Sequence, residues 1–233
     1  MDNRYYFKNI EGNMVFIENQ EFSHLSKVRR AKIGDEIVAF NGDGFDYNLK
    51  ITSINKNNAE CEVIKKTKNK AVNENIIVFL AMIKNDALSE AIDHLTELNV
   101  SKCYIFEADR SVAVLDDKKI DKLNQISIQA CKQSERARVM EIEIISKKQM
   151  IEMTSKLKNV FFAYENAETK PSKFSGEFAV IIGPEGGFST DEVSLFSKYA
   201  KTISLGSTIL RAQVACVASV SMLKAVRVWL QVL

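Results

Sequence analysis

The residues best suited to chemistry lie in two short glycine-bearing segments near the C-terminus. The first, GPEGG at residues 183–187, follows an apolar run and precedes a helix signal with Ser189 as N-cap and Glu192 as its capping-box partner. The second, LGSTILRA at residues 205–212, again leads from a short strand into an apolar helix. Because glycines let a backbone turn sharply and approach a ligand closely, the two segments predict one ligand cleft at the carboxyl ends of neighbouring strands.

A purely structural strand-to-helix turn is the alternative reading of GPEGG. The cleft is favoured because two such turns occur together, and because Pro184, one of only two prolines, is followed by the carboxylate of Glu185. Glu185 could equally be an anion favoured near a helix N-terminus. Neither segment carries the Lys-Ser/Thr of a P-loop or the G-x-G-x-x-G of a dinucleotide site, which disfavours ordinary phosphate cradles.

Arg211 stands where the second segment becomes a helix, within expected reach of the cleft. A guanidinium there could hold a phosphate or a developing oxyanion with two hydrogen bonds. The alternative is a surface helix residue, the usual place of an arginine. No Ser/His/Asp or Cys/His constellation accompanies it, so nucleophilic catalysis is disfavoured.

Basic residues that could grip an RNA backbone occur in three parts of the sequence. In the N-terminal region, basic residues occur with the aromatics Tyr5, Tyr6 and Phe7, which we expect to be exposed. Together they would supply the phosphate contacts and base stacking that RNA binding needs. The alternative is a solvated charged face. The RNA-binding candidates are Arg4, Lys27, Arg29, Arg30, Arg110, Arg136 and Arg138.

The composition is that of an ordinary globular protein. The chain has 233 residues, 46% of them hydrophobic and 27% charged, with a net charge of only +2. Any RNA affinity must therefore come from local clusters of charge. Its four cysteines are far apart in apolar segments and are expected to be buried, reduced thiols. With two histidines and no metal-ligand spacing, we expect no metal site.

The N-terminus shows no signal peptide, and a cytoplasmic location is expected. The apolar stretch 214–233 contains Lys224 and Arg227, which would be costly in lipid. We therefore expect a buried helix there that also packs against a second copy in a homodimer.

Hydrophobic patterning predicts two domains, residues 1–70 and 71–233. The first reads as a β-barrel-like module with a small helix at 21–30 and a strand reversal at Asn41–Gly44. A basic, polar run from Lys65 to Asn75 marks the expected boundary. Strands are predicted in this module at residues 35–40, 45–55 and 59–65.

The second region alternates strands with helices and predicts an α/β fold, an open parallel sheet with helices on both faces. Its strands are predicted at residues 76–83, 102–107, 139–145, 160–164, 178–182 and 203–205. Its helices are predicted at residues 86–98, 119–134, 147–157, 191–200 and 212–230.

The two glycine segments resemble those of the SPOUT class of S-adenosylmethionine-dependent RNA methyltransferases. More narrowly, the chain is similar to the bacterial family that methylates N3 of a uridine in small-subunit (16S) ribosomal RNA. The likeness covers nearly the whole chain in order, through the segments RYYF, HLSKVRR, NGDG, TELNV, EADRS and QACKQSER.

The resemblance implies a PUA-like RNA-binding domain followed by an α/β SPOUT domain with a trefoil knot. It implies S-adenosylmethionine as cofactor, 16S rRNA within the 30S subunit as substrate, and a homodimer. The implied cofactor contacts are Gly183, Pro184, Glu185, Gly186, Leu205, Gly206, Ile209, Leu210 and Arg211.

One departure from the family pattern falls beside the second glycine segment. Two residues after Arg211 the family usually has Glu, where this chain has Gln213, which keeps hydrogen-bonding capacity but loses charge. Arg211 and Gln213 are the candidate catalytic residues. A related SPOUT enzyme acting on another rRNA or tRNA nucleotide and a catalytically silent RNA-binding or ribosome-assembly protein remain alternatives. A nucleotide-hydrolysing enzyme is disfavoured, because the sequence has no phosphate-binding or metal-binding motif.

Overall fold

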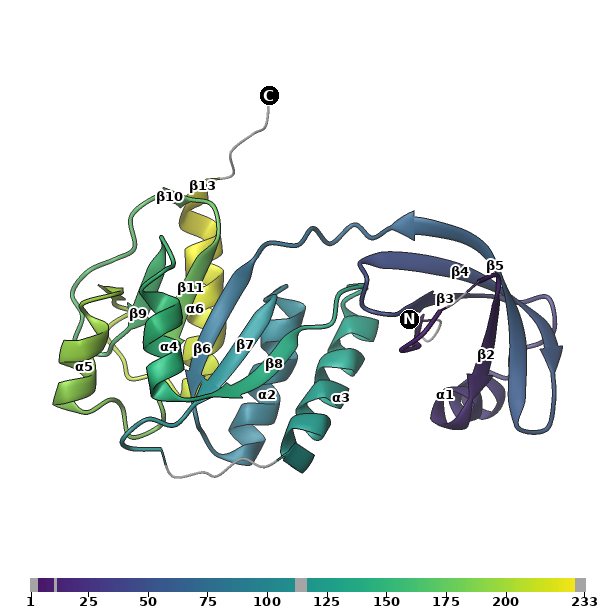
Figure 1. The fold of residues 1–233 in the computed structure, drawn as a ribbon, viewed down its shortest axis with the longest axis horizontal. Helices are drawn as coiled ribbons and strands as arrows, with labels where there is room; N and C mark the ends of the chain where they lie inside the picture. The colour runs from purple at the N-terminus through teal and green to yellow at the C-terminus, as the bar shows by residue number, and fades with distance from the viewer. Residues whose placement is uncertain (1–3, 11, 112–116, 229–233) are drawn as a thin grey trace. The chain divides into compact units, whose positions relative to one another are not determined.

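The computed structural model describes residues 4–10, 12–111 and 117–228 (Figure 1). The chain divides into two compact units: the first comprises Met1–Val72 with Cys131–Val139, and the second Asn73–Ala130 with Met140–Leu233. No helix within the described residues is long and apolar enough to cross a membrane.

The first unit is built on a curved sheet with strand order β1-β3-β4-β5-β2, in which only the β1–β3 pair is parallel. Its side chains enclose an apolar core that includes Tyr5, Ile17, Leu49 and Cys61. The elements are β1 (Arg4–Tyr6), β2 (Met14–Glu18), α1 (Asn19–Ser23), the π-helical η1 (His24–Val28), β3 (Glu36–Phe40), β4 (Phe45–Ile54) and β5 (Asn58–Lys68).

Three features of this unit differ from the sequence expectation. Strands β1 and β2 were not predicted, and β5 continues through Lys68. The expected single helix is instead a short α-helix, α1, followed directly by the π-helix η1. The basic run that was expected to be a linker therefore begins inside a strand. Strand β2 was hidden because its exposed positions, Met14 and Phe16, are as apolar as its buried ones.

The segment Cys131–Val139 also belongs to the first unit. Cys131 and Ala137 pack with Phe40 in a small buried cluster. Lys132 forms an ion pair with Glu21, and the Asn69 side-chain amide donates a hydrogen bond to the Glu135 carbonyl at 2.9 Å. These contacts join residues more than sixty positions apart, which patterning along the chain does not reveal.

The second unit is a six-stranded sheet with order β12-β9-β11-β6-β7-β8, all pairs parallel, as the sequence predicted. The strands are β6 (Ile76–Ala81), β7 (Lys102–Phe106), β8 (Glu141–Ile145), β9 (Val160–Ala163), β11 (Phe178–Ile182) and β12 (Lys201–Ile203). The helices are α2 (Asn85–Glu97), α3 (Asp117–Gln133), α4 (Lys147–Thr154), α5 (Thr190–Phe196) and α6 (Ala212–Val226).

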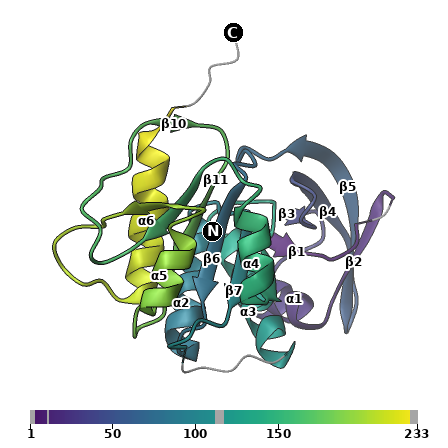
Figure 2. The same cartoon turned by 60° about the vertical axis from the view of Figure 1, so that its left-hand side comes forward.

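Helices cover both faces of this sheet (Figures 1 and 2). Successive residues of a strand point to opposite faces, so each buried strand contributes to two cores. Val78, Ile105 and Val180 pack with α2, α3 and α6 in one core. Phe79, Phe106 and Ile181 pack with α4 and α5 in the other. The expected helices on both faces of the sheet are thus confirmed.

The end of α6 is held by a charged cluster and a short pair of strands. Strand β10 (Phe174–Ser175) pairs in parallel with β13 (Arg227–Val228). The Lys224 ammonium lies 2.8 Å from Glu74, and Arg227 pairs with the same carboxylate while its guanidinium sits 5.4 Å from the Phe178 ring centre. The charges inside the apolar C-terminal stretch are therefore paired within the unit.

All four cysteines are free and buried, as the sequence predicted. Burial raises the pKa of Cys61 to about 11 and that of Cys103 to about 12. Thiols in this state are not nucleophiles at neutral pH.

Candidate active site

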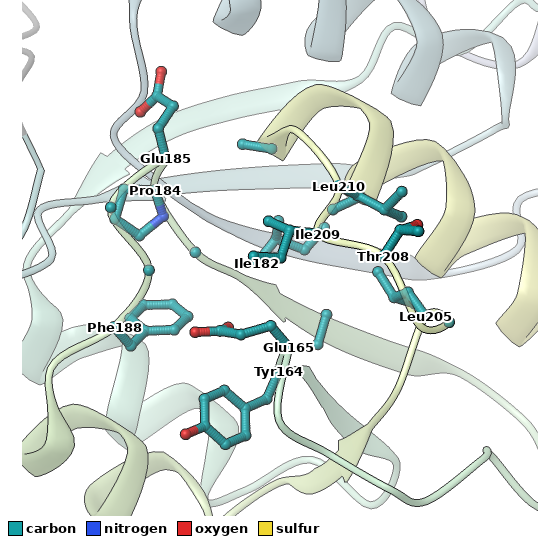
Figure 3. Close-up of a pocket in the computed structure, with 17 residues that line it drawn as sticks. Tyr164, Glu165, Ile182, Pro184, Glu185, Phe188, Leu205, Thr208, Ile209 and Leu210 are labelled. Atoms are coloured by element: carbon teal, nitrogen blue, oxygen red, sulfur yellow. The ribbon is translucent and has the colours of Figure 1, made fainter.

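The candidate site is a pocket of about 270 Å³ at the carboxyl ends of β9 and β11, beside the loop that follows β12 (Figure 3). It lies where the two glycine segments were predicted to meet. Its lining consists of Ala163, Tyr164, Glu165, Ile182, Gly183, Pro184, Glu185, Gly186, Gly187, Phe188, Leu205, Gly206, Thr208, Ile209, Leu210, Ala212 and Ala215.

The first glycine loop is shaped by close packing. A Cβ at Gly183 would come within 2.9 Å of the Phe188 ring, and Gly187 has a left-handed φ of +68°. The Gly187 amide donates to the Pro184 carbonyl at 2.9 Å and closes a tight turn. Side chains at these two glycines would strain the loop, so its backbone forms part of the pocket wall.

Glu185 lines the pocket, but its carboxylate is engaged elsewhere. Its Oε1 accepts a hydrogen bond of 3.0 Å from the Lys84 amide, at the start of α2. Figure 3 shows the side chain pointing away from Glu165 and Phe188. The glutamate therefore ties the loop to α2, and its backbone is the part that faces the pocket.

The second glycine loop forms the opposite wall. Gly206 has a φ of +131°, which only glycine adopts readily, and open space surrounds its Cβ position. Ile209 is 89% exposed at the pocket mouth, an unusual place for a large apolar side chain. Such exposure fits a surface that a ligand or partner covers.

The structure brings eight of the nine expected cofactor contacts to this pocket and leaves Arg211 outside its lining. Arg211 is the exposed N-cap residue of α6, between the lining residues Leu210 and Ala212. Arg211 therefore lies next to the pocket because it caps the helix whose start forms part of the pocket wall.

Gln213 lies in the first turn of α6 and points to a neighbouring helix. Its Nε2 donates to the Glu90 carboxylate on α2 at 3.3 Å. A glutamate at this position would oppose the Glu90 charge, so Gln213 and Glu90 suit each other. The structure places Gln213 between two helices and outside the pocket lining.

Sequence reasoning missed the third side of the pocket, formed by Tyr164 and Glu165. Strand β9 ends at Ala163, and the Ala167 amide donates to the Tyr164 carbonyl at 3.0 Å, which makes a turn that carries Glu165. The sequence could have predicted Glu165 as a pocket residue. It directly follows a predicted strand of a parallel sheet, and ligands bind at the carboxyl ends of such strands.

A polar network supports the first loop from behind. The predicted capping box is confirmed: the Ser189 Oγ accepts from the Glu192 amide, and Glu192 accepts from the Ser189 amide. Lys147 bridges Asp109 and Glu192, and Ser189 donates to Asp109. Hydrogen bonds from Lys147 and Ser189 hold the pKa of the Asp109 carboxyl below its usual value.

Arg110 belongs to the same edge of the site. Its guanidinium donates to the Gly186 carbonyl at 3.1 Å while the residue stays exposed. This hydrogen bond holds the Arg110 side chain against the first glycine loop.

Two of the RNA-binding candidates in the first unit are not exposed. Arg4 pairs with Asp46 at 2.7 Å and lies 4.7 Å from the Phe40 ring centre, with only 9% of its side chain exposed. Arg136 is buried, and Tyr5 is fully buried in the core. The expectation of an exposed aromatic surface beside Arg4 is therefore wrong for Tyr5.

Of the other four candidates in this unit, three are exposed. Lys27, Arg30 and Arg138 are exposed, whereas Arg29 is half-buried, with Nη2 at 3.5 Å from the Glu36 carbonyl. The Arg138 guanidinium packs on Gly44, where an added Cβ would lie 2.8 Å from its Nε. Across the described residues, no group of three or more His, Cys, Asp or Glu side chains could hold a metal ion.

Comparisons with known proteins assign both units. A family model described as RNA methyltransferase domain matches residues 70–224, and one described as RNA methyltransferase PUA domain matches residues 17–64. The ribosomal RNA small subunit methyltransferase E of Rickettsia conorii is 30% identical, over 92% of this chain and 91% of its own length. The Bacillus subtilis protein of the same name is 30% identical, over 85% of each chain.

A solved structure supports the fold assignment. The crystal structure of a ribosomal RNA small subunit methyltransferase E from Neisseria gonorrhoeae bound to S-adenosyl methionine superimposes with a TM-score of 0.83. It is 24% identical and covers 96% of this chain and 97% of that chain. Together these matches establish that the chain belongs to the ribosomal RNA small subunit methyltransferase E family, with a PUA-like domain followed by an α/β SPOUT methyltransferase domain.

Proposed function

We propose that this protein transfers a methyl group from S-adenosylmethionine to N3 of a uridine in 16S ribosomal RNA. The observation that carries the proposal is the pocket between the two glycine loops, in a chain of this family. Related names and a cofactor-bound relative point to rRNA methylation. The choice of uridine N3 rests on the family resemblance of the sequence.

The residues around the pocket fit this cofactor. Apolar side chains such as Ile182, Leu205 and Leu210 suit a flat nucleoside base, and the glycine loops offer backbone groups at close range. The expected contacts on the two loops would hold it, with Glu185 acting through its backbone. When bound, S-adenosylmethionine supplies an activated methyl group on a positively charged sulfur.

The protein's own task is then to position the uridine and to stabilise the anion left when its N3 proton departs. Arg211 is an exposed guanidinium between two pocket residues, so it is the side chain proposed to donate hydrogen bonds to that developing charge. Gln213, held by Glu90, fixes the first turn of α6 and so acts as a positioning residue. The target base must leave its stack to be reached.

RNA binding is assigned to the exposed cations. In the first unit these are Lys27, Arg30 and Arg138, and Arg110 lies beside the glycine loop. We propose that the substrate is 16S rRNA within the 30S subunit and that the enzyme acts as a homodimer. The exposed Ile209 and Val214 near the start of α6 support a covering partner.

Mass spectrometry of 30S particles incubated with the protein and methyl-labelled cofactor tests the proposal. After digestion to nucleosides, the label is expected in N3-methyluridine. Label in a 2′-O-methylated nucleoside would instead identify a related SPOUT enzyme. Cofactor binding without any label in the RNA would identify a silent RNA-binding protein.

A further inference from the structure

Glu165 lines the pocket with a carboxylate that makes no hydrogen bond or ion pair with the described residues. No lysine, arginine or histidine is among the pocket's lining residues, and the two acidic ones are Glu165 and Glu185. The Glu185 carboxylate accepts the Lys84 amide and points away. Within the described part of the chain, the Glu165 carboxylate has neither an ion pair nor a hydrogen-bond donor.

The Glu165 carboxylate, although the residue is exposed, lies beside the first glycine loop. The turn closed by the Ala167 amide and the Tyr164 carbonyl projects it from the end of β9. Its Oε1 lies 3.2 Å from where a Cβ on Gly187 would stand, so it packs directly on the first glycine loop. Figure 3 shows the carboxylate reaching across the pocket toward Phe188.

A pocket with one free carboxylate and no basic side chain suits a ligand that carries positive charge. The methyl donor has a sulfonium, whereas the product of methyl transfer, S-adenosylhomocysteine, has a neutral thioether and is otherwise the same molecule. Both retain the ammonium and carboxylate of the amino-acid part. A carboxylate near the sulfur would therefore separate donor from product.

We propose that Glu165 is a specificity residue that senses the sulfonium charge, so that the pocket favours the methyl donor over the demethylated product. This inference rests on the proposed use of S-adenosylmethionine. Its consequence is physical: once the methyl group has left, the attraction between sulfur and carboxylate disappears, and the product leaves more readily.

Isothermal titration calorimetry of the full chain with S-adenosylmethionine and with S-adenosylhomocysteine tests the inference. Glu165→Gln keeps the shape of the side chain and removes its charge. The variant is expected to bind the donor roughly tenfold more weakly while its affinity for the product stays unchanged, a size within the range of a partly exposed charge pair. Glu168→Gln, the same change at an exposed residue outside the pocket lining, should leave both affinities as in the wild type.

Sinefungin, which carries an ammonium where the donor carries its methyl sulfonium, provides a second probe. Its affinity should fall with that of the donor in Glu165→Gln. If donor and product lose affinity equally, Glu165 contacts the shared amino-acid part and the inference is overturned. If the wild type binds neither compound, the proposed function itself fails, which is a different result.

Discussion

Gly183 and Gly186 of the first glycine loop differ in how closely they are packed. Gly183 is packed against Phe188, an aromatic residue of the core, whereas a Cβ at Gly186 would make only an ordinary contact of 3.4 Å with Arg110. Equal substitutions at the two positions should therefore separate the stability of the loop from its use as a ligand wall.

Gly183→Ala is expected to lower the free energy of unfolding by about 1–3 kcal/mol, because the methyl group must displace the Phe188 ring. Gly186→Ala should cost less than about 1 kcal/mol, since its methyl group has room. Urea unfolding followed by circular dichroism measures both. Equal losses would mean that Phe188 moves aside freely.

Gly186→Val should abolish S-adenosylmethionine binding with an unchanged circular dichroism spectrum, because the backbone of this loop forms part of the pocket wall. Calorimetric titration measures the binding.

Helices α4 and α5 both begin with a capping box of the same kind. Ser146 caps α4 with Gln149, and Ser189 caps α5 with Glu192. Only Ser189 also donates to Asp109, within the network behind the glycine loop. The two serines are a matched pair for testing that network.

Ser146→Ala and Ser189→Ala should each lower stability by about 1 kcal/mol through loss of the cap. Ser189→Ala should additionally weaken cofactor binding, because the helix start and the loop before it lose their tie to Asp109. Thermal unfolding and calorimetric titration on both variants provide the comparison. A loss of affinity in Ser146→Ala of the same size would show that helix stability alone is responsible.

Two exposed cations of the first unit, Lys27 and Arg30, lie in η1 and just after it. Replacing Lys27 and Arg30 by alanine should weaken RNA binding and flatten its salt dependence, because fewer counterions are released from phosphates. Arg4→Ala should instead destabilise the unit, since Arg4 is paired with Asp46 and packed on Phe40. Filter binding across a salt series, with melting curves, distinguishes the two effects. Wild-type RNA affinity in the double variant would make these cations a solvated face.

Glu74, just before β6, binds the end of α6 through Lys224 and Arg227 and so joins distant parts of the chain. Burial acts to raise the pKa of the Glu74 carboxyl, but hydrogen bonds from Lys224 and Asn99, with the charges of Lys224 and Arg227, hold that pKa below its usual value. A carboxyl with a lowered pKa in the fold binds its proton less tightly there than in the unfolded chain. Its contribution to stability is therefore complete above the unfolded pKa of about 4.3 and is lost as pH falls through the folded value.

Glu74→Gln is expected to lower the free energy of unfolding by roughly 3 kcal/mol at pH 7, because two cations lose their partner. The difference from wild type should shrink as the pH falls below about 4, where the wild-type carboxyl takes up its proton. Urea unfolding at a series of pH values gives this difference directly. A difference that stays constant down to acidic pH would show that shape, and not charge, is what Glu74 contributes.

The proposed homodimer can be tested at an exposed apolar residue of α6. Val214 in α6 is 45% exposed although it lies outside the pocket lining. If α6 packs against a second copy, Val214→Arg should convert a dimer into a monomer at micromolar concentration without unfolding the chain. Sedimentation velocity on both proteins measures this. A wild-type monomer would remove the dimer and any RNA site shared between its subunits.

Short-range features of this protein were readable from the sequence. The parallel strands of the second unit follow from hydrophobic periodicity, and the capping box of Ser189 and Glu192 follows from local hydrogen bonding. The meeting of the two glycine loops follows from the rule that ligands bind at the carboxyl ends of neighbouring parallel strands. The two-residue strands β10 and β13 were not predicted, because a strand of two residues is too short to show an alternating hydrophobic pattern.

Which side chains share an environment could not be predicted from the sequence and depends on the folded arrangement of distant segments. It placed Glu165 in the pocket, paired Arg4 with Asp46, turned Gln213 toward Glu90 and joined Cys131–Val139 to the first unit. Each of these depends on residues brought together from distant parts of the chain. Residue type and local pattern determine which backbone forms and which face is apolar, but the burial of a charge and the identity of its partner are set by the packing of elements across the whole fold.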